Sequence, residues 1–422
     1  MNTKGVAIII VAVLIVAGAG GYFLLTNDNG NNGNEFDLSK DAVGREVIVP
    51  NSIEDGIVPV GVGSLRWVSY FGMEENVVMK DTNDNSNYLG KSYMYAVGGV
   101  MNALTTMTGA SGGLTNDNVS TILNFEKKPI VIVTHNVYSA NNLQIEALLA
   151  GGINVCVIYE LEDFIDLSTF KVSEKFEYQT KLIGKILKDS ERATELIDGI
   201  NSTISDIREL VKDVTPVKGY VGGLSYAGTK GMEYSSGSYL PFELTNVENV
   251  LSGNELVAGY APAFLTNTIT KDTIVFVDAN GSNVMRKGGD NVSETLIKAF
   301  NANGNTGYIA CPYVWFGLNF DNVLIGAYQV ISYVYGDQLS KAAFDAKVDA
   351  IYDLFYGTHM STRTYTATGV APPTTETRIY DDMSNVIQNM NSATSNNGWR
   401  APLYGSAYFL SDGKLTDVIV PT

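Results

Sequence analysis

The stretch that decides the fold is DSERATELIDGINSTISDIRELVK, residues 189–212. Its apolar side chains recur every three or four residues, which places them on one stripe of an amphipathic helix. The stripe consists of Ala193, Leu196, Ile197, Ile200, Ile204, Ile207 and Val211. Asp189 suits the N-cap, and Pro216 prevents much continuation. At 1.5 Å per residue, such a helix is about 35 Å long, roughly the width of a small domain.

The sequence on both sides of this helix has the alternating strand and helix pattern of an open α/β sheet. Strands are expected before it at 46–49, 57–62, 77–80, 129–134 and 153–158, and after it at 219–223, 273–278 and 308–311. We therefore predict two open α/β lobes, residues 41–188 and 214–357, joined by one long rigid interdomain helix at 189–213. A long surface helix on a single domain is the alternative. Residues 358–422 form a C-terminal extension whose place in the fold the sequence does not give.

The first 25 residues predict a transmembrane helix or a signal. The segment from Val6 to Leu25 contains no charged residue. As a helix, it is long enough to cross a hydrocarbon core of about 30 Å. We therefore expect a single-pass anchor in the cell membrane. Lys4 before the apolar segment predicts that the N-terminus lies inside the cell and the body outside the cytoplasm. Cleavage near Ala17 to Ala19 is the alternative. The polar residues 26–40 then read as a flexible linker.

Composition excludes several classes of function. The 422 residues carry 45 acidic and 28 basic side chains, a net charge of -17, which argues against a nucleic-acid partner. The two cysteines, Cys156 and Cys311, lie in separate apolar runs, so we expect buried free thiols and no disulfide framework. The two histidines, His135 and His359, are too few for a multi-histidine metal site.

Four segments carry a resemblance to the extracytoplasmic substrate-binding proteins of ABC importers for iron-siderophore and cobalamin, the class III periplasmic binding proteins. They are DAVGREVIVP at 41–50, VGVGSLRWVSYFGMEENVV at 60–78, KGMEYSSGSYLPFELTNVENVL at 230–251, and CPYVWFGLNFDNVLIGAYQVISYVYG with FDAKVDAIYDLFYG between 311 and 357. The resemblance implies two lobes that move only slightly around a rigid helix and hold a ligand in the cleft between them. It also implies an ABC permease and its ATPase as partners.

The resemblance also implies one docking glutamate on each lobe, and this chain departs from that pattern. Ser120 and Ala263 stand where those acids are expected, with Asp117 or Glu255 as the nearest substitutes. A surface-anchored binding or adhesion protein that kept the two-lobe fold without a transporter is therefore the main alternative.

Candidate ligand residues lie just after the predicted strands, because ligands bind at the carboxyl ends of strands in open α/β sheets. They are Arg66, Tyr93, Tyr95, His135, Tyr138, Tyr226, Lys230, Glu233, Tyr313 and Trp315. A site rich in Tyr and Trp suits a bulky or planar metal chelate, such as an iron siderophore, haem or a corrinoid, with Arg66 or Lys230 on its acidic groups. A bare metal ion or an oxyanion stays open. No intrinsic cofactor is expected.

Two enzyme classes fit the sequence poorly. Gly61-Val62-Gly63 begins a dinucleotide-binding fingerprint, but Arg66 stands at the third glycine. Ser225 has Ala227 where a nucleophile elbow needs glycine. We therefore predict a binding protein and not an enzyme.

Overall fold

The computed structural model describes most of the chain after Glu35. The described residues are 36–84, 92–94, 104–109, 113–225, 230–254, 257–279, 281, 285, 291–314, 317–357, 405–409 and 415–419. Phe36–Thr422 form one compact unit. The predicted anchor lies outside the described residues, and among the described ones no helix combines the length and apolar character that a membrane crossing needs.

The residues before the long helix α7 (Ser190–Leu210) build a parallel three-stranded sheet in the order β1-β4-β5. Its strands and nearby elements are β1 (Ile57–Val60), β4 (Ile130–Thr134), β5 (Asn154–Ile158), α1 (Ser64–Tyr70), α3 (Asn116–Leu123), α4 (His135–Ala140) and α5 (Asn142–Ala150). Alternate residues of one strand enter different cores: Val58 and Val60 belong to one hydrophobic cluster, and Ile57 belongs to another. Both faces of the sheet are therefore covered, as the continuous apolar run PIVIVT predicts.

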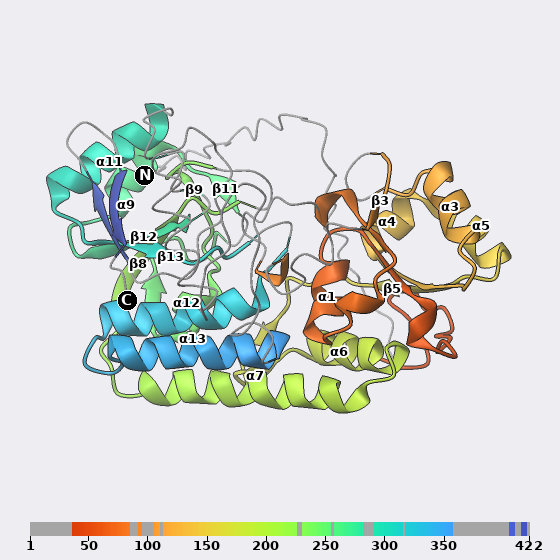
Figure 1. Ribbon diagram of the computed structural model, residues 1–422. Coiled ribbons are helices and arrows are strands. Elements are labelled where there is room, and N and C mark those ends of the chain that lie inside the picture. The colour runs from red at the N-terminus through yellow and green to blue at the C-terminus, as the bar shows by residue number, and fades with distance from the viewer. Residues whose placement is uncertain are drawn as a thin grey trace, which may run out of the picture. The chain divides into compact units, whose positions relative to one another are not determined.

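The residues after α7 build a second sheet in the order β10-β8-β12-β13-β14-β15. Its strands are β8 (Val217–Gly222), β10 (Val247–Asn249), β12 (Thr273–Asp278), β13 (Gly307–Ala310), β14 (Gly405–Phe409) and β15 (Leu415–Ile419). The first four are parallel, whereas β14 pairs antiparallel with β13 and β15 with β14. The C-terminal extension thus supplies the last two strands at one edge of this sheet, β14 and β15, which we call the two edge strands (dark blue in Figure 1).

Shorter elements complete the described chain. They are η1 (Ile53–Asp55), η2 (Glu74–Asn76), η3 (Thr82–Asp84), β2 (Met79–Lys80), β3 (Thr105–Thr106), β6 (Ile165–Asp166), β7 (Lys171–Val172), β9 (Tyr234–Ser235), β11 (Ala258–Gly259), α8 (Leu240–Leu244), α9 (Pro262–Thr268) and α11 (Asn291–Asn303).

The predicted long helix is confirmed as α7, Ser190–Leu210, with Asp189 as its N-cap. The Asp189 carboxylate accepts a hydrogen bond from Arg192 N at 3.1 Å. The predicted apolar stripe is buried. It packs on α6 (Glu174–Ile186) and also on α12 (Phe320–Val334) and α13 (Lys341–Tyr356), which run beside it in Figure 1. The helix therefore contacts elements from both sides of the sequence.

We call residues 41–188 the N-terminal half, and residues 214–357 with the two edge strands the C-terminal half. One hydrophobic cluster contains buried residues of both halves and of α7. The helix therefore lies along a shared core. That the halves are separate lobes with the boundaries given above stays a prediction.

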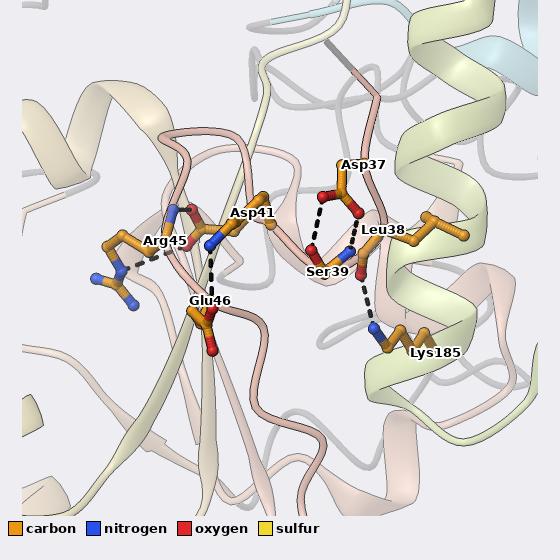
Figure 2. Close-up of polar contacts among 8 residues, drawn as sticks. Asp37, Leu38, Ser39, Asp41, Arg45, Glu46 and Lys185 are labelled. Carbon is orange, nitrogen blue, oxygen red and sulfur yellow. Dashed lines mark hydrogen bonds and ion pairs between the residues drawn. The ribbon is translucent and has the colours of Figure 1, made fainter. Parts of the chain in front are cut away.

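The predicted strand at 46–49 is wrong: Glu46 forms only an isolated antiparallel bridge with Lys40, after a turn at 42–44 that Asp41 organises (Figure 2). Asp41 Oδ1 accepts from Arg45 N at 2.9 Å, and its other oxygen accepts from Val157 N at 3.2 Å. The Arg45 guanidinium donates to Val155 O at 2.6 Å, and Lys185 Nζ donates to Leu38 O at 2.7 Å. The entry segment is thus attached to β5 and α6 mainly by side chains, together with one backbone hydrogen bond from Ala42 N to Val157 O at 3.0 Å.

Candidate ligand-binding site

The carboxyl end of β1 turns sharply into α1 through two glycines with positive φ, Gly61 and Gly63. A Cβ on Gly61 would lie 2.2 Å from Thr134 Oγ1, so this position requires glycine for space as well as for conformation. Gly61 N donates to Asp81 Oδ2 at 3.0 Å, and Ser64 Oγ donates to Val60 O at 2.6 Å. These contacts fix the start of α1 and the position of Arg66 one turn further on.

Arg66 lies between the two halves and is only 5% exposed. Its guanidinium donates to Leu318 O at 2.6 Å and to Asn319 Oδ1 at 2.9 Å, both in the C-terminal half. It also lies over the rings of Tyr93, at 5.3 Å, and Phe320, at 5.9 Å. Arg66 Nε has no hydrogen-bond partner among the described residues. The role of Arg66 in ligand contact stays a prediction.

Phe320, the first residue of α12, inserts into an aromatic cluster of the N-terminal half. Its ring centroid lies 4.9 Å from Phe164, 5.0 Å from Phe176 and 5.7 Å from Trp67. Phe320 is 2% exposed. The two halves therefore share an apolar core directly beside Arg66.

A buried polar chain crosses the same junction. Tyr356, in α13, donates to Asp321 Oδ2 at 2.9 Å, and Ser92 Oγ of the N-terminal half lies 3.1 Å from the Tyr356 hydroxyl oxygen. Burial raises the pKa of Asp321 above its ordinary value, against hydrogen bonds and the charge of Arg66, which lower it. Burial, and then the charge of Asp321, raise the pKa of Tyr356.

Tyr93 lies at this junction too, held inside the N-terminal half. Its hydroxyl donates to Asp84 Oδ1 at 2.8 Å, and the residue is 1% exposed. Burial raises its pKa, and the charge of Asp84 adds to that effect. The structure therefore brings together two of the predicted ligand residues, Arg66 and Tyr93.

The other candidates in the N-terminal half, His135 and Tyr138, lie in α4 at the carboxyl end of β4. Both are partly buried, which leaves part of each side chain accessible. Arg45 lies over the Tyr138 ring at 5.6 Å. The backbone N–H of Asn136 donates to Glu160 Oε1 at 2.8 Å, which joins the ends of β4 and β5.

The described candidates in the C-terminal half already have protein partners. Lys230 Nζ lies over the Tyr234 ring at 4.8 Å, and Glu233 Oε2 accepts from Ser293 Oγ at 3.1 Å. Both side chains are partly buried.

Tyr313, in contrast, is buried in the C-terminal half. Its hydroxyl accepts from Leu240 N at 3.3 Å, and its backbone N–H donates to Asp278 Oδ2 at 2.9 Å. Tyr95, Tyr226 and Trp315 lie outside the described residues.

Sequence reasoning missed the side chains of α12 and α13 that meet the N-terminal half. Phe320, Asp321 and Tyr356 lie in the C-terminal segments that carry the resemblance, but they were not among the predicted ligand residues. The signal was the polar run at Asn319, Asp321 and Asn322 at the start of a helix that is otherwise apolar. Buried polar side chains at a helix start need partners, and here the partners come from elsewhere in the fold. Among the described residues no group of three or more His, Cys, Asp or Glu side chains has the arrangement of a metal site.

The predicted docking positions are both on surface helices. Ser120 in α3 and Ala263 in α9 are exposed, as is the possible substitute Asp117, while Glu255 lies outside the described residues. The surface therefore presents a hydroxyl and a methyl group where the resemblance implies carboxylates.

Comparison with known proteins identifies the fold. No protein-family model and no curated protein matches the chain. Several solved structures do, among them the following three. A periplasmic solute-binding protein of Veillonella parvula is 16% identical, over 75% of this chain and 92% of its own, with a TM-score of 0.54. The molybdate-bound MolA of Haemophilus influenzae is 15% identical, over 79% and 99%, with a TM-score of 0.56. The TroA-like binding protein FepB of Veillonella parvula is 14% identical, over 75% and 95%, with a TM-score of 0.51.

These three neighbours are described as periplasmic binding proteins. At such low identity the likeness concerns the fold. The chain has the mixed α/β fold of the TroA-like periplasmic solute-binding proteins, with parallel sheets and covering helices.

Proposed function

We propose that this chain is the extracytoplasmic solute-binding protein of an ABC importer and captures a metal chelate between its two halves. The observation that carries the proposal is the pair of parallel sheets, β1-β4-β5 and β10-β8-β12-β13, on the two sides of one junction. Open parallel sheets bind ligands at the carboxyl ends of their strands. Arg66, His135 and Tyr313 all follow such ends.

The ligand we propose carries an anionic group. Arg66 is a buried cation, and the hydrogen bonds that its guanidinium makes are to neutral oxygens. Its Nε is a further donor without a partner among the described residues. An anionic oxygen would use that donor and offset the buried charge. An iron siderophore, haem and a corrinoid are the chelates that fit the aromatic content best.

The accessible residues would contact the rest of the chelate. His135, Tyr138, Lys230 and Glu233 are partly buried, so each has surface left for a ligand. Tyr95, Tyr226 and Trp315 belong to the same proposed site. The predicted helix at 6–25 would hold the body outside the cytoplasm at the cell membrane, near a permease and its ATPase.

The test is binding to the purified full chain in detergent. Haemin, cyanocobalamin, ferric desferrioxamine and sodium molybdate are added separately, and binding is followed by native mass spectrometry and thermal unfolding. We expect one chelate to bind with one-to-one stoichiometry, which at 100 times its Kd adds about 2.7 kcal/mol to stability. His135→Ala and Tyr138→Ala should weaken that binding, whereas Leu143→Ala, at a residue 82% exposed on α5, should not. Failure of all four probes to bind would contradict the chelate proposal, and binding of molybdate alone would replace the chelate by an oxyanion.

A second function is favoured by the exposed Ser120 and Ala263. A surface binding or adhesion protein without a transporter needs no docking carboxylates. Reconstitution with the permease and ATPase encoded nearest to it separates the two functions. Stimulation of ATP hydrolysis by the loaded chain supports import, and its absence supports the surface binding protein.

A further inference from the structure

The two halves are joined by polar contacts that are independent of α7. Arg66 donates from the N-terminal half to Leu318 O and Asn319 Oδ1 of the C-terminal half. Ser92 reaches the Tyr356 hydroxyl, which in turn donates to Asp321. Because the tyrosine has one proton and gives it to the carboxylate, Ser92 must be the donor to the phenolic oxygen. We call these six residues the joint latch.

The acceptors of Arg66 are themselves held in place. Asn319 Nδ2 donates to Pro312 O at 3.1 Å, and Asn319 N donates to Tyr313 O at 3.0 Å. The side-chain oxygen of Asn319, Oδ1, is therefore held in a fixed orientation toward Arg66. A guanidinium that meets such preset acceptors loses little further freedom on binding them.

Glycines surround the guanidinium on both sides of the joint. A Cβ on Gly63, in the N-terminal half, would lie 3.9 Å from the Arg66 terminal nitrogen that binds Leu318. A Cβ on Gly317, in the C-terminal half, would lie 3.8 Å from the same nitrogen. Both residues have positive φ, which favours glycine. The two backbones thus approach the same guanidinium from opposite halves.

Burial makes the latch hard to break once it is formed. Arg66, Ser92, Asp321 and Tyr356 are each 5% exposed or less. Separation of the halves would remove the hydrogen-bond acceptors of the Arg66 guanidinium, would take Ser92 away from Tyr356, and would expose Phe320 from its aromatic cluster. A buried hydrogen-bonded group that loses its partner is destabilised more than an exposed one.

We propose that the joint latch fixes the two halves in one arrangement in the ligand-free chain, so that α7 alone does not set their spacing. A single helix permits bending and twisting at its ends, whereas two further contact points, Arg66 with Leu318 and Asn319, and Ser92 with Tyr356, restrict both motions. The latch therefore pre-organises the carboxyl edges of the two sheets before any solute arrives. This inference does not depend on the identity of a ligand or on a transporter.

The test is a distance distribution between spin labels on the full chain without ligand. Leu143→Cys in α5 and Phe264→Cys in α9 place the labels on exposed positions, 82% and 45% accessible, in opposite halves. The native thiols, Cys156 and Cys311, are buried, and burial raises the pKa of both, so they should label slowly. The chain without added cysteines measures that background.

We expect one narrow distance in the parent and a second, opened population in the double variant Arg66→Met with Tyr356→Phe. Loss of hydrogen bonds to a charged group raises the ratio of opened to latched chains by about tenfold or more. Arg45→Met is the matched control, because Arg45 bonds only within the N-terminal half, to Asp41 and Val155, in the contacts described here. It should keep the parent distribution.

An unchanged distribution in the folded double variant would overturn the proposal. If the double variant does not fold, the single variants Tyr356→Phe and Asn319→Ala are measured in its place. An opened population in them supports the proposal, and an unchanged distribution overturns it. Each single variant removes one hydrogen-bonding group of the latch and leaves the Arg66 charge in the protein.

Discussion

Tyr356 donates its hydroxyl hydrogen to Asp321 across 2.9 Å, and this bond joins the last turn of α13 to the first turn of α12. Asp321 has no exposed surface. The bond therefore lies at the point where both C-terminal helices meet the N-terminal half. A carboxyl group in such a place is stabilised more readily in its neutral form than in its charged form.

The first prediction concerns the pH dependence that Asp321 imposes. Burial raises its pKa in the folded state above the ordinary value of 3.8. The stability that this group contributes is therefore complete below the unfolded pKa and is lost as the pH rises through the folded one. Asp321→Asn removes the titration and keeps an acceptor for Tyr356. As the pH rises from the unfolded-state pKa of Asp321 to its folded-state pKa, we expect the stability of the variant relative to the parent to increase. Above the folded-state pKa, the difference should level off.

Urea unfolding of parent and variant at a series of pH values measures this difference. Asp213→Asn, at an exposed position after α7, is the control for loss of a carboxylate on the surface. A difference for Asp321→Asn that is constant with pH, or that decreases as the pH rises, would show that the carboxyl group is not destabilised by burial.

The second prediction concerns the apolar part of the joint. Phe320→Ala should reduce the free energy of unfolding by about 3–5 kcal/mol, because it empties a filled aromatic cluster. Phe264→Ala removes the same ring from a position 45% exposed, where the effect should be within about 0.5 kcal/mol. Urea unfolding of both variants checks this. Equal effects at the two positions would mean that the cluster around Phe320 does not stabilise the fold.

The sequence predicted the long helix well because its signals are local. The apolar stripe of α7 and the Asp189 cap depend on spacing within about 20 residues, which tertiary contacts did not override. The buried strands β4 and β12 were likewise predicted from continuous apolar runs. The strand predicted at 46–49 was wrong because side chains of the preceding turn have partners over 100 residues away: Asp41 accepts from Val157 N, and Arg45 donates to Val155 O.

The candidate site was predictable only in part, for the same reason. The position of Arg66 after β1 follows from local pattern, but its partners Leu318 and Asn319 are about 250 residues distant in sequence. No periodicity in either segment indicates that pairing. Burial of Tyr313 was missed similarly, since its hydrogen bond to Leu240 N joins two segments that lie far apart in the sequence.

The third prediction concerns Gly199, a glycine within α7 whose low helix preference should destabilise the helix. Glycine in a helix is less favourable than alanine by about 1 kcal/mol, so Gly199→Ala alone would be expected to stabilise. The structure reverses this expectation, because a Cβ there would lie 2.3 Å from Leu354 Cδ1 in α13. We expect Gly199→Ala to destabilise by about 1–3 kcal/mol through overpacking.

A double-variant cycle with Leu354→Ala isolates that clash. With Leu354 truncated, Gly199→Ala should become stabilising, since only the helix preference remains. Ser202→Ala, on the exposed face of α7, is the control for helix preference alone. Destabilisation by Gly199→Ala of the same size in both backgrounds would mean that Leu354 is not the residue it displaces.

The fourth prediction concerns the two C-terminal edge strands. β14 covers the edge of β13 through the pairs Gly307 with Ala407 and Tyr308 with Ser406. Truncation after Tyr404 removes β14 and β15 and leaves the backbone groups of β13 unpaired at an open edge. Such an edge is a template for pairing with other chains, so we expect a lower melting temperature and concentration-dependent association. Truncation after Ile419 retains both strands and should behave as the full chain does in thermal unfolding and light scattering. If the chain truncated after Tyr404 gave the same melting temperature and light scattering as the chain truncated after Ile419, the C-terminal segment would have no part in closing this sheet.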